Sequence, residues 1–328
     1  MSKKTLVLSR REVEKLINMR RVLTLVEKAF IAQAEGRVQM PAKIYIHLEK
    51  YHGDFRAMPA YIQGMEACGI KWVNVHPENK KYGLPSIMAV IILSEPKTGF
   101  PLAIMDGTLI TNLRTGAAGG IAAKYLANKN SSRVALVGCG KQAQAQLIAL
   151  NKVSRIKNVL LYDNKRFNAI AFAKKMKYLG FKMKLCANIK ECVKEADIVV
   201  TTTPSRKPII KAAWIKKGTH INAIGADARG KEELDPAILK VARIIVDDKT
   251  QAMHSGEINV PITKRIIKEK DICGTLGEVI IGKKKGRLNK SDITIFDSTG
   301  LAIHDVAVAN FVYLEAIKKR LGKFIVLT

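Results

Sequence analysis

Two rhythms of apolar and polar positions divide this chain. Between residues 40 and 104, short apolar runs alternate with glycine and proline turns, which is typical of a mostly antiparallel sheet. From residue 132 to about residue 299, apolar runs alternate with segments of helical spacing, which predicts a doubly wound, mostly parallel sheet with right-handed crossovers. The expected strands are 43–48, 69–75 and 86–93 in the first region, and 134–137, 159–162, 198–202, 221–224, 244–246 and 293–296 in the second.

Apolar spacing also predicts three longer helices. One begins at a capping box formed by Ser9 and Glu12 and ends at Glu35, before a glycine. A second, 111–127, is rich in glycine and alanine, so another backbone or a cofactor could come close to it. The last, 302–321, ends in three basic residues that suit the C-terminal end of a helix.

The length and composition of the chain limit its possible domain organisation. The 328 residues, 48% of them hydrophobic, suffice for two domains with substantial cores. We expect an α/β fold with a Rossmann doubly wound domain at 116–299, and a second, α+β domain formed by 1–115 with 300–328. The five cysteines form no C-x-x-C pair and the histidines are scattered, so we expect reduced thiols in the cytoplasm and no metal site. No stretch resembles a membrane span or a signal peptide, so no membrane association is expected.

The chain is strongly basic, with a formal net charge of +28. Nucleic-acid binding would require this charge to gather on one face or in one arm. Lysines instead occur in nearly every expected helix and loop, and the densest clusters, 283–285 and 318–320, lack interleaved aromatic residues. We therefore interpret the excess as a solvated basic surface without a nucleic-acid partner, whose field attracts anionic small molecules.

The strand 134–137 runs into a glycine loop that is typical of dinucleotide binding. In Gly138-x-Gly140-x-x-Ala143, the first glycine permits a tight turn, the second leaves room for a pyrophosphate, and the alanine lets the next helix pack closely. That helix begins with Lys141 and Gln142. Its N-terminus would face the anion. A plain glycine turn is the alternative, so the context of the loop matters.

An acidic residue follows the next expected strand at a suitable distance. Asp163 ends the run 159–162, about 20 residues beyond the loop, where a carboxylate holds the adenosine ribose hydroxyls. This favours NAD as the cofactor. Lys165 and Arg166 follow directly and could offset the repulsion of a 2′-phosphate, so NADP stays open.

Ligands of doubly wound sheets bind beyond the carboxyl ends of the strands, where further polar segments occur. Three such segments are candidates for the cofactor and the chemistry: Thr201-Thr202-Thr203, Ala226-Asp227 and Ser298. Threonines are also ordinary strand residues, so both interpretations of the first segment stay open. Small residues before Asp227 clear space for it to project into the crevice. Ser298 either approaches the nicotinamide or caps the final helix.

The first domain supplies three basic candidates, Arg56, Lys71 and Arg114. Lys71 interrupts the apolar strand 69–75, and its side chain either turns outward to solvent or is held inward beside an anion. Because lysine is almost never buried unpaired, the pattern alone favours the outward orientation. The pattern alone likewise predicts that Arg56 is a cation in a loop and that Arg114 is a charge on the surface of a helix.

Several of these segments occur in the same order in the ornithine cyclodeaminase/mu-crystallin family. The chain resembles that family over nearly its whole length and looks most like the archaeal alanine dehydrogenases within it. The matching segments are 56–59, 70–77, 113–117, 138–140, 222–227 and 296–300. The resemblance implies a homodimer, with an N-terminal substrate and dimerisation domain completed by the C-terminal helix. It also implies an active site in the cleft beside the Rossmann domain, with Thr115 contacting the cofactor.

The resemblance further implies roles for individual residues. Lys71 and Asp227 become catalytic, and Arg114 binds the substrate, with help from Lys43. Family members that act on ornithine carry an acid where this chain has Arg56. An arginine there repels a cationic side chain, which favours a small neutral amino acid such as alanine and puts ornithine cyclisation in doubt.

These expectations combine into one hypothesis, the reversible NAD-dependent oxidation of L-alanine to pyruvate and ammonia. Arg56 and Arg114 would hold the substrate carboxylate, Asp227 would activate water, and Lys71 would stabilise the carbinolamine. A cyclic-imine reductase or an ornithine cyclodeaminase would share the hydride machinery and differ in the pocket. A mu-crystallin-like protein that binds NAD(P)H or a small molecule is the non-enzymatic alternative, because fold alone does not fix a reaction.

Overall fold

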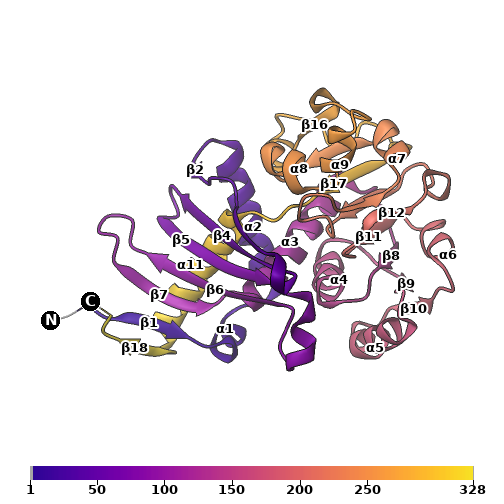
Figure 1. Cartoon of the computed structure of the whole chain (residues 1–328). Coiled ribbons are helices and arrows are strands. Elements are labelled where there is room, and N and C mark those ends of the chain that lie inside the picture. The colour runs from indigo at the N-terminus through magenta and orange to yellow at the C-terminus, as the bar shows by residue number, and fades with distance from the viewer. Residues whose placement is uncertain (1–2, 328) are drawn as a thin grey trace. The chain divides into compact units, whose positions relative to one another are not determined.

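The computed structural model describes residues 3–327, which fall into two compact units (Figure 1). Unit 1 comprises Met1–Arg114 with Leu301–Thr328, and unit 2 comprises Thr115–Gly300. Each boundary differs by one residue from the expected one. The chain passes from unit 1 to unit 2 within α3 (Thr108–Leu126). In the described part of the chain, no helix combines the length and apolar character that a membrane span needs.

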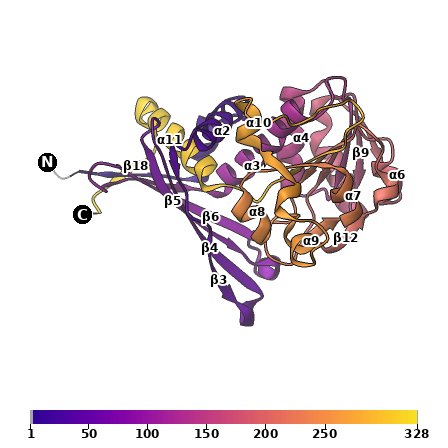
Figure 2. The same ribbon diagram turned by 90° about the horizontal axis from the view of Figure 1, so that it is seen from above.

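Unit 1 is built on a mostly antiparallel sheet. Its strands lie in the order β18-β1-β7-β6-β5-β4-β2, with β3 also paired to β4, and only the β1–β7 pair among these is parallel. The long helix α11 packs across β4, β5 and β6, and α2 lies on the same side of the sheet (Figure 2). The bounds are β1 (Thr5–Leu8), α1 (Arg10–Leu16), α2 (Met19–Ala34), β2 (Val38–Gln39), β3 (Ile44–Leu48), β4 (Gly53–Ile62), β5 (Ala67–Val75), β6 (Ile87–Ser94), β7 (Pro101–Asp106), α11 (Ala302–Lys319) and β18 (Lys323–Ile325).

Alternation along these strands gives the sheet a buried face and an open face. Every second residue of β4 from Arg56 to Ile62 is buried. The register pairs Arg56 with Val73 and Met58 with Lys71, so these side chains share the buried face, over which α11 packs. The outward orientation that the pattern alone favours for Lys71 is therefore wrong, since only 1% of this residue is exposed.

The open face of the same sheet is apolar. Four of its side chains, from three strands, are between 37% and 49% exposed: Ile46, Trp72, Val90 and Ile92. Phe55 stacks on Trp72 on this face, with ring centroids 5.1 Å apart. A contiguous apolar patch of this kind on a folded unit is typical of a protein–protein interface.

The N-terminal segment forms two helices where apolar spacing predicts one. The capping box is present, because the Glu12 carboxylate accepts from both the N–H and the hydroxyl of Ser9 at 2.7 Å. However, Ile17 is extended, and Asn18 caps α2 by accepting from the Arg21 N–H at 3.1 Å. The competing cap at Asn18 ends the first helix after two turns, although the apolar spacing continues across the break.

Unit 2 is a doubly wound α/β domain, which confirms the predicted fold class. Its eight-stranded sheet has the order β10-β9-β8-β11-β13-β17-β15-β16, with parallel pairing throughout. The strand order reverses at β8, which places the topological switch point at the carboxyl end of that strand. The bounds are β8 (Arg133–Val137), α4 (Lys141–Val153), β9 (Asn158–Tyr162), α5 (Arg166–Met176), β10 (Lys182–Leu185), α6 (Ile189–Val193), β11 (Ile198–Thr201), β12 (Arg206–Ile210), β13 (His220–Ala223), β14 (Glu232–Leu234), α7 (Pro236–Val241), β15 (Arg243–Val246), α8 (Lys249–Ser255), α9 (Asn259–Thr263), β16 (Ile272–Thr275), α10 (Leu276–Ile280) and β17 (Thr294–Asp297).

Both faces of the unit 2 sheet are buried. Along β8, Val134 and Leu136 enter one hydrophobic core, while Ala135 and Val137 enter a second core on the other face. This explains why its strands read as continuous apolar runs in the sequence. The carboxyl ends of the strands, together with the loops that follow them, are left to carry polar chemistry.

Candidate functional site

A charged cluster is buried under α11 in unit 1. Lys71, Arg114 and Asp305 are 1%, 4% and 0% exposed, respectively. Asp305 accepts from both cations, at 2.7 Å from Lys71 Nζ and at 2.9 Å from Arg114 Nε. The interpretation of Arg114 as a surface charge is therefore wrong, because its guanidinium group is held inside the unit by an opposite charge.

The cluster changes the protonation of its members. Burial, reinforced by the charge of Arg114, lowers the pKa of Lys71 to about 7, although Asp305 opposes this shift. Burial favours a higher pKa for Asp305, but Arg114 and Lys71 outweigh it and hold that pKa below its ordinary value. Asp305 therefore stays ionised at neutral pH, while Lys71 can gain or lose a proton there, as a general acid or base requires.

Arg56 lies on the same buried face and belongs to β4, where sequence reasoning treated it as a loop cation. It is 5% exposed, and its Nε lies 2.7 Å from Asp54 Oδ1. Its guanidinium group lies over the ring of Tyr45, the β3 residue paired with it, 5.2 Å from the ring centroid. Lys43 contributes to the low pKa of Lys71, so the fold brings this fourth predicted cation within electrostatic reach of the cluster.

In unit 2, the predicted glycine loop turns at the carboxyl end of β8. Gly138 has a φ of +91°, a conformation that side chains disfavour. Gly140 has an ordinary φ of −83°, and a methyl group there would meet no protein atom within 4 Å. The fold itself therefore does not require glycine at position 140, whereas close approach of a phosphate group would require it. Ala143 is fully buried and seats α4 against the sheet, so the loop fits a nucleotide.

Asp163 lies directly beside this loop. Its Oδ2 accepts from the Cys139 N–H at 2.9 Å, and its Oδ1 accepts from the Lys165 N–H and Asn168 Nδ2 at the same distance. Burial, together with the charge of Asp163, raises the pKa of the Cys139 thiol to about 12. Cys139 therefore stays neutral and serves as a small packed side chain in the loop.

The loop after β11 is tied to the glycine loop. Thr202 Oγ1 donates to the Gly138 carbonyl at 3.0 Å. The hydroxyls of Thr201 and Thr203 are bonded to a buried carboxylate, that of Glu233. The three predicted threonines are thus brought to the carboxyl edge of the sheet, with their hydroxyls already bonded inside unit 2.

The remaining predicted residues of unit 2 lie in different local settings. Asp227 follows β13 in a loop, with its Oδ1 2.6 Å from Lys231 Nζ, and Ala226 beside it is fully buried. Ser298 follows β17 and is 3% exposed. The carbonyl of Thr115 accepts from Gln146 of α4 at 2.9 Å, which holds the start of unit 2 against the helix that follows the glycine loop.

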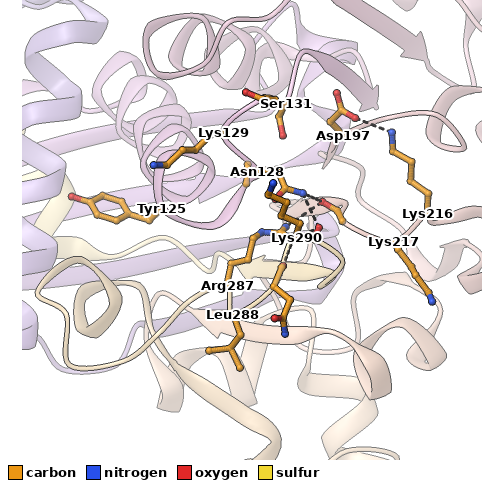
Figure 3. A pocket seen from close by; sticks show the side chains of 14 residues that line it. Tyr125, Asn128, Lys129, Ser131, Asp197, Lys216, Lys217, Arg287, Leu288 and Lys290 are labelled. Atoms are coloured by element: carbon orange, nitrogen blue, oxygen red, sulfur yellow. Dashed lines mark hydrogen bonds and ion pairs between the residues drawn. The ribbon is translucent and has the colours of Figure 1, made fainter.

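Unit 2 also has a concave region at the opposite, amino edge of its sheet (Figure 3). Its lining includes five cations, Lys129, Lys216, Lys217, Arg287 and Lys290, and Asp197 pairs with Lys216 at 2.8 Å. The loops here precede their strands, whereas ligands of doubly wound sheets bind beyond the carboxyl ends. This pocket is therefore not the candidate site, despite its charge. Among the described residues, no group of His, Cys, Asp or Glu side chains could hold a metal ion.

Sequence reasoning missed Asp305, the acid that organises the unit 1 cluster. The last segment that carries the family resemblance ends at residue 300, five positions before it. A signal was nevertheless present, because Asp305 follows His304 in a helix whose other residues from Ala302 to Ala309 are all apolar. A lone charge in such a helix is either a surface residue or a buried partner, and a buried lysine elsewhere would have decided between them.

These features define a class of protein: a doubly wound nucleotide-binding domain, with a glycine loop at its switch point, joined to a unit with a buried cationic cluster. The chain matches the ornithine cyclodeaminase/mu-crystallin family over residues 3–320, and it belongs to that family.

Individual relatives cover nearly the whole chain. An alanine dehydrogenase of Archaeoglobus fulgidus is 53% identical over 320 residues, which are 97% of each chain. The solved structure of an archaeal alanine dehydrogenase dimer with bound NAD is similar with a TM-score of 0.96 and 52% identity, covering 99% of this chain and 100% of that one. The Δ1-pyrroline-2-carboxylate reductase of Thermococcus litoralis, solved with NADH and L-proline, is similar with a TM-score of 0.95 and 40% identity, covering 98% and 100%.

Proposed function

We propose that this protein is an NAD-dependent dehydrogenase that oxidises L-alanine to pyruvate and ammonia and also catalyses the reverse amination. The observation that carries the proposal is the buried cluster in which Lys71 and Arg114 share the carboxylate of Asp305. Two buried cations around one acid favour a further anion, and the carboxylate of an amino acid supplies it. The 53% identity to an alanine dehydrogenase supports this choice of substrate.

Unit 2 would hold the cofactor. The glycine loop and the start of α4, with Lys141 and Gln142, would bind the pyrophosphate, and Asp163 would bind the ribose hydroxyls, which favours NAD over NADP. Bound NAD supplies the acceptor for the hydride that leaves the substrate α-carbon. The residues proposed to line the rest of the nucleotide site are Thr115, Thr201, Thr202, Thr203, Ala226 and Ser298.

The protein's own side chains would divide the remaining work. Arg56 and Arg114, with Lys43, hold the substrate carboxylate and so fix the orientation of the α-carbon. Asp227 takes a proton from the water that attacks the iminium carbon. Lys71 exchanges protons with the resulting carbinolamine as it collapses to pyruvate and ammonia, a role that suits its pKa of about 7.

The test is direct. The purified protein is mixed with NAD and a panel containing alanine, ornithine and proline, and reduced cofactor is followed by its absorbance. We expect turnover with alanine that exceeds turnover with the other two, and higher activity with NAD than with NADP at equal concentration. No reduced cofactor with alanine, measured with protein that binds NADH, would refute the proposed substrate.

A cyclic-imine reductase is the second candidate function. It is supported by the similarity to the Thermococcus litoralis reductase, whose structure contains NADH and L-proline. Because both reactions transfer a hydride to or from a carbon that bears nitrogen and a carboxylate, the same cationic cluster would serve either. Oxidation of NADH with Δ1-pyrroline-2-carboxylate, faster than with pyruvate and ammonia, would favour this candidate.

We further propose that the protein is a homodimer of the cytoplasm. The apolar open face of the unit 1 sheet is suited to pack against a second copy of the chain. Its residues Ile46, Trp72 and Val90 are between 41% and 49% exposed. The similar archaeal structure is a dimer. The five cysteines are free, as thiols in a reducing compartment are.

A further inference from the structure

A single buried carboxylate joins two strand-end loops of unit 2. Glu233, in the short strand β14, is fully buried. Its Oε2 accepts from Thr201 Oγ1 at 2.6 Å and from the Gly225 N–H at 3.0 Å. Its Oε1 accepts from the N–H and the hydroxyl of Thr203, both at 2.7 Å. The carboxylate therefore accepts three hydrogen bonds from the end of β11 and the residues that follow it, and one from the loop after β13.

The two loops carry residues assigned to the nucleotide and to the chemistry. The first continues from Thr201 through Thr202, which in turn donates to the glycine loop at Gly138. The second contains Asp227, two residues after Gly225. Glu233 is thus the shared anchor of the loops that follow β11 and β13.

The space between the Glu233 carboxylate and Gly225 is tightly filled. A methyl group at Gly225 would lie 2.2 Å from the Thr203 carbonyl oxygen and 2.5 Å from Glu233 Oε2, closer than side-chain carbons approach an oxygen. Glycine at 225 is therefore required by the Thr203 backbone as well as by Glu233, and its N–H faces the carboxylate. The sequence alone suggests only that glycine clears space for Asp227, and the structure gives it a more specific partner.

A second carboxylate, that of Glu257, holds the backbone of Glu233 in place. Glu257 Oε1 accepts from the N–H groups of Glu233 and Leu234, at 2.8 and 2.7 Å. The N–H of Glu257 in turn donates to Asp297 Oδ1 at 2.9 Å, and Asp297 is the last residue of β17, directly before Ser298. The hydrogen bonds therefore run from the end of β17 through Glu257 to Glu233 and its two loops.

We propose that Glu233 is a positioning residue for the nucleotide site, which sets the spacing between the threonine loop after β11 and the loop that carries Asp227. The assignment of these loops rests on the proposed function, whereas the contacts themselves do not. An ionised carboxylate is suited to this task because both of its oxygens only accept, so it satisfies two backbone N–H groups on different loops at once. Burial raises the pKa of Glu233, and the hydrogen bonds that it accepts from the two loops oppose that rise. An amide of the same shape presents a donor to one of them and pushes that loop away.

The test compares Glu233→Gln with Glu232→Gln. Glu232 is the preceding residue of β14, is 5% exposed and pairs with Lys264 at 3.8 Å, so it is a matched control for a buried glutamate in the same strand. We expect Glu233→Gln to weaken NADH binding, followed by fluorescence titration, by about 10-fold to 100-fold, and to lower kcat for alanine, because a buried N–H loses its acceptor. The control should stay within about threefold of the wild type in both.

The readouts separate positioning from a purely structural role. If Glu233→Gln lowers the thermal midpoint but binds NADH and turns over alanine as the wild type does below that temperature, the proposal is overturned. If the wild type binds NADH but does not oxidise alanine, the proposed substrate fails, and the binding titration still tests Glu233. Should Glu233→Gln not fold, Glu233→Asp keeps the charge but shortens the side chain, which withdraws it from both loops, and unchanged NADH affinity in that variant would overturn the proposal.

Discussion

The two units bury their charged side chains in different ways. In unit 1, two cations from different elements converge on one acid, Asp305, which lies between 2.7 and 2.9 Å from both. In unit 2, the fully buried charges are acids, and each of them accepts from at least one backbone N–H group. These fully buried acids are Glu233, Asp247, Glu257 and Asp297.

The two arrangements differ in how much freedom they leave to the buried charged group. A lysine held between an arginine and an aspartate can still change its charge, because its pKa is lowered to about 7. An acid bonded to backbone N–H groups has little freedom, but it fixes the loops that donate to it. The unit 1 arrangement therefore suits the proton transfer and anion binding that we propose for it, while the unit 2 arrangement holds loops in place.

The largest expected effect comes from Lys71. We predict that Lys71→Met lowers kcat for alanine by about 10³-fold, because the variant loses the group that exchanges protons with the intermediate. NADH affinity should change little, since the glycine loop belongs to unit 2. The exposed Lys80 provides the control, because Lys80→Met removes a lysine of the same unit without touching the cluster. Turnover within about tenfold of wild type in Lys71→Met would remove this lysine from the chemistry.

Neutralising one buried acid in each unit tests whether the two units bury their charges in different ways. Asp305→Asn leaves two buried cations without their acid and should cost about 3–5 kcal/mol of stability. Glu257→Gln keeps an Oε1 that accepts from the N–H groups of Glu233 and Leu234, and it should cost about 1 kcal/mol or less.

Thermal unfolding without cofactor measures both changes. Burial raises the pKa of Glu257 well above its ordinary value, and the charge of Glu233 adds to this, so a neutral glutamine matches the form that the site favours. Equal losses of stability in the two variants would show that the units do not differ as described.

The pH dependence of the reverse reaction sharpens the role of the cluster. Lys71 must be an ammonium group to donate to the oxygen of pyruvate, and its pKa of about 7 means that this form is lost as the pH rises through neutrality. We predict that kcat/KM for pyruvate, at constant free ammonia, falls about tenfold per pH unit above that value. Lys71→Arg, which does not titrate in this range, should abolish the fall. A wild-type profile that stays flat into the alkaline range would contradict the assignment.

The smallest expected effect concerns the open face of the unit 1 sheet, for which unit 2 has no equivalent. Trp72→Asp places a charge in the apolar patch and should weaken dimerisation by at least about tenfold, as measured by sedimentation across a concentration series. Tyr178→Asp, at a 70% exposed position of unit 2, is the matched control and should leave assembly unchanged. A monomeric wild type would contradict the proposed dimer.

The fold was largely predictable because its signals are local. The parallel strands of unit 2 are buried on both faces, so β8, β9 and β11 appear as apolar runs, and the glycine loop follows its strand directly. The polar edge strand β10 (Lys182–Leu185) was missed, because its exposed lysines leave no such run. Strand β4 was missed as well, since Pro59 interrupts the pattern and Arg56 looks like a loop residue.

The sequence by itself determined the apolar strands of unit 2, the fold class, the nucleotide loop and the identity of the cations. Only the tertiary structure decided what those cations do. Lys71 is buried because Asp305, 234 residues further along the chain, reaches it from α11, and no local pattern encodes a contact at that separation. The same holds for Glu233, which joins two loops that follow different strands. Local preferences arise between neighbours in the chain, whereas the balance of buried charge is settled only when distant elements pack.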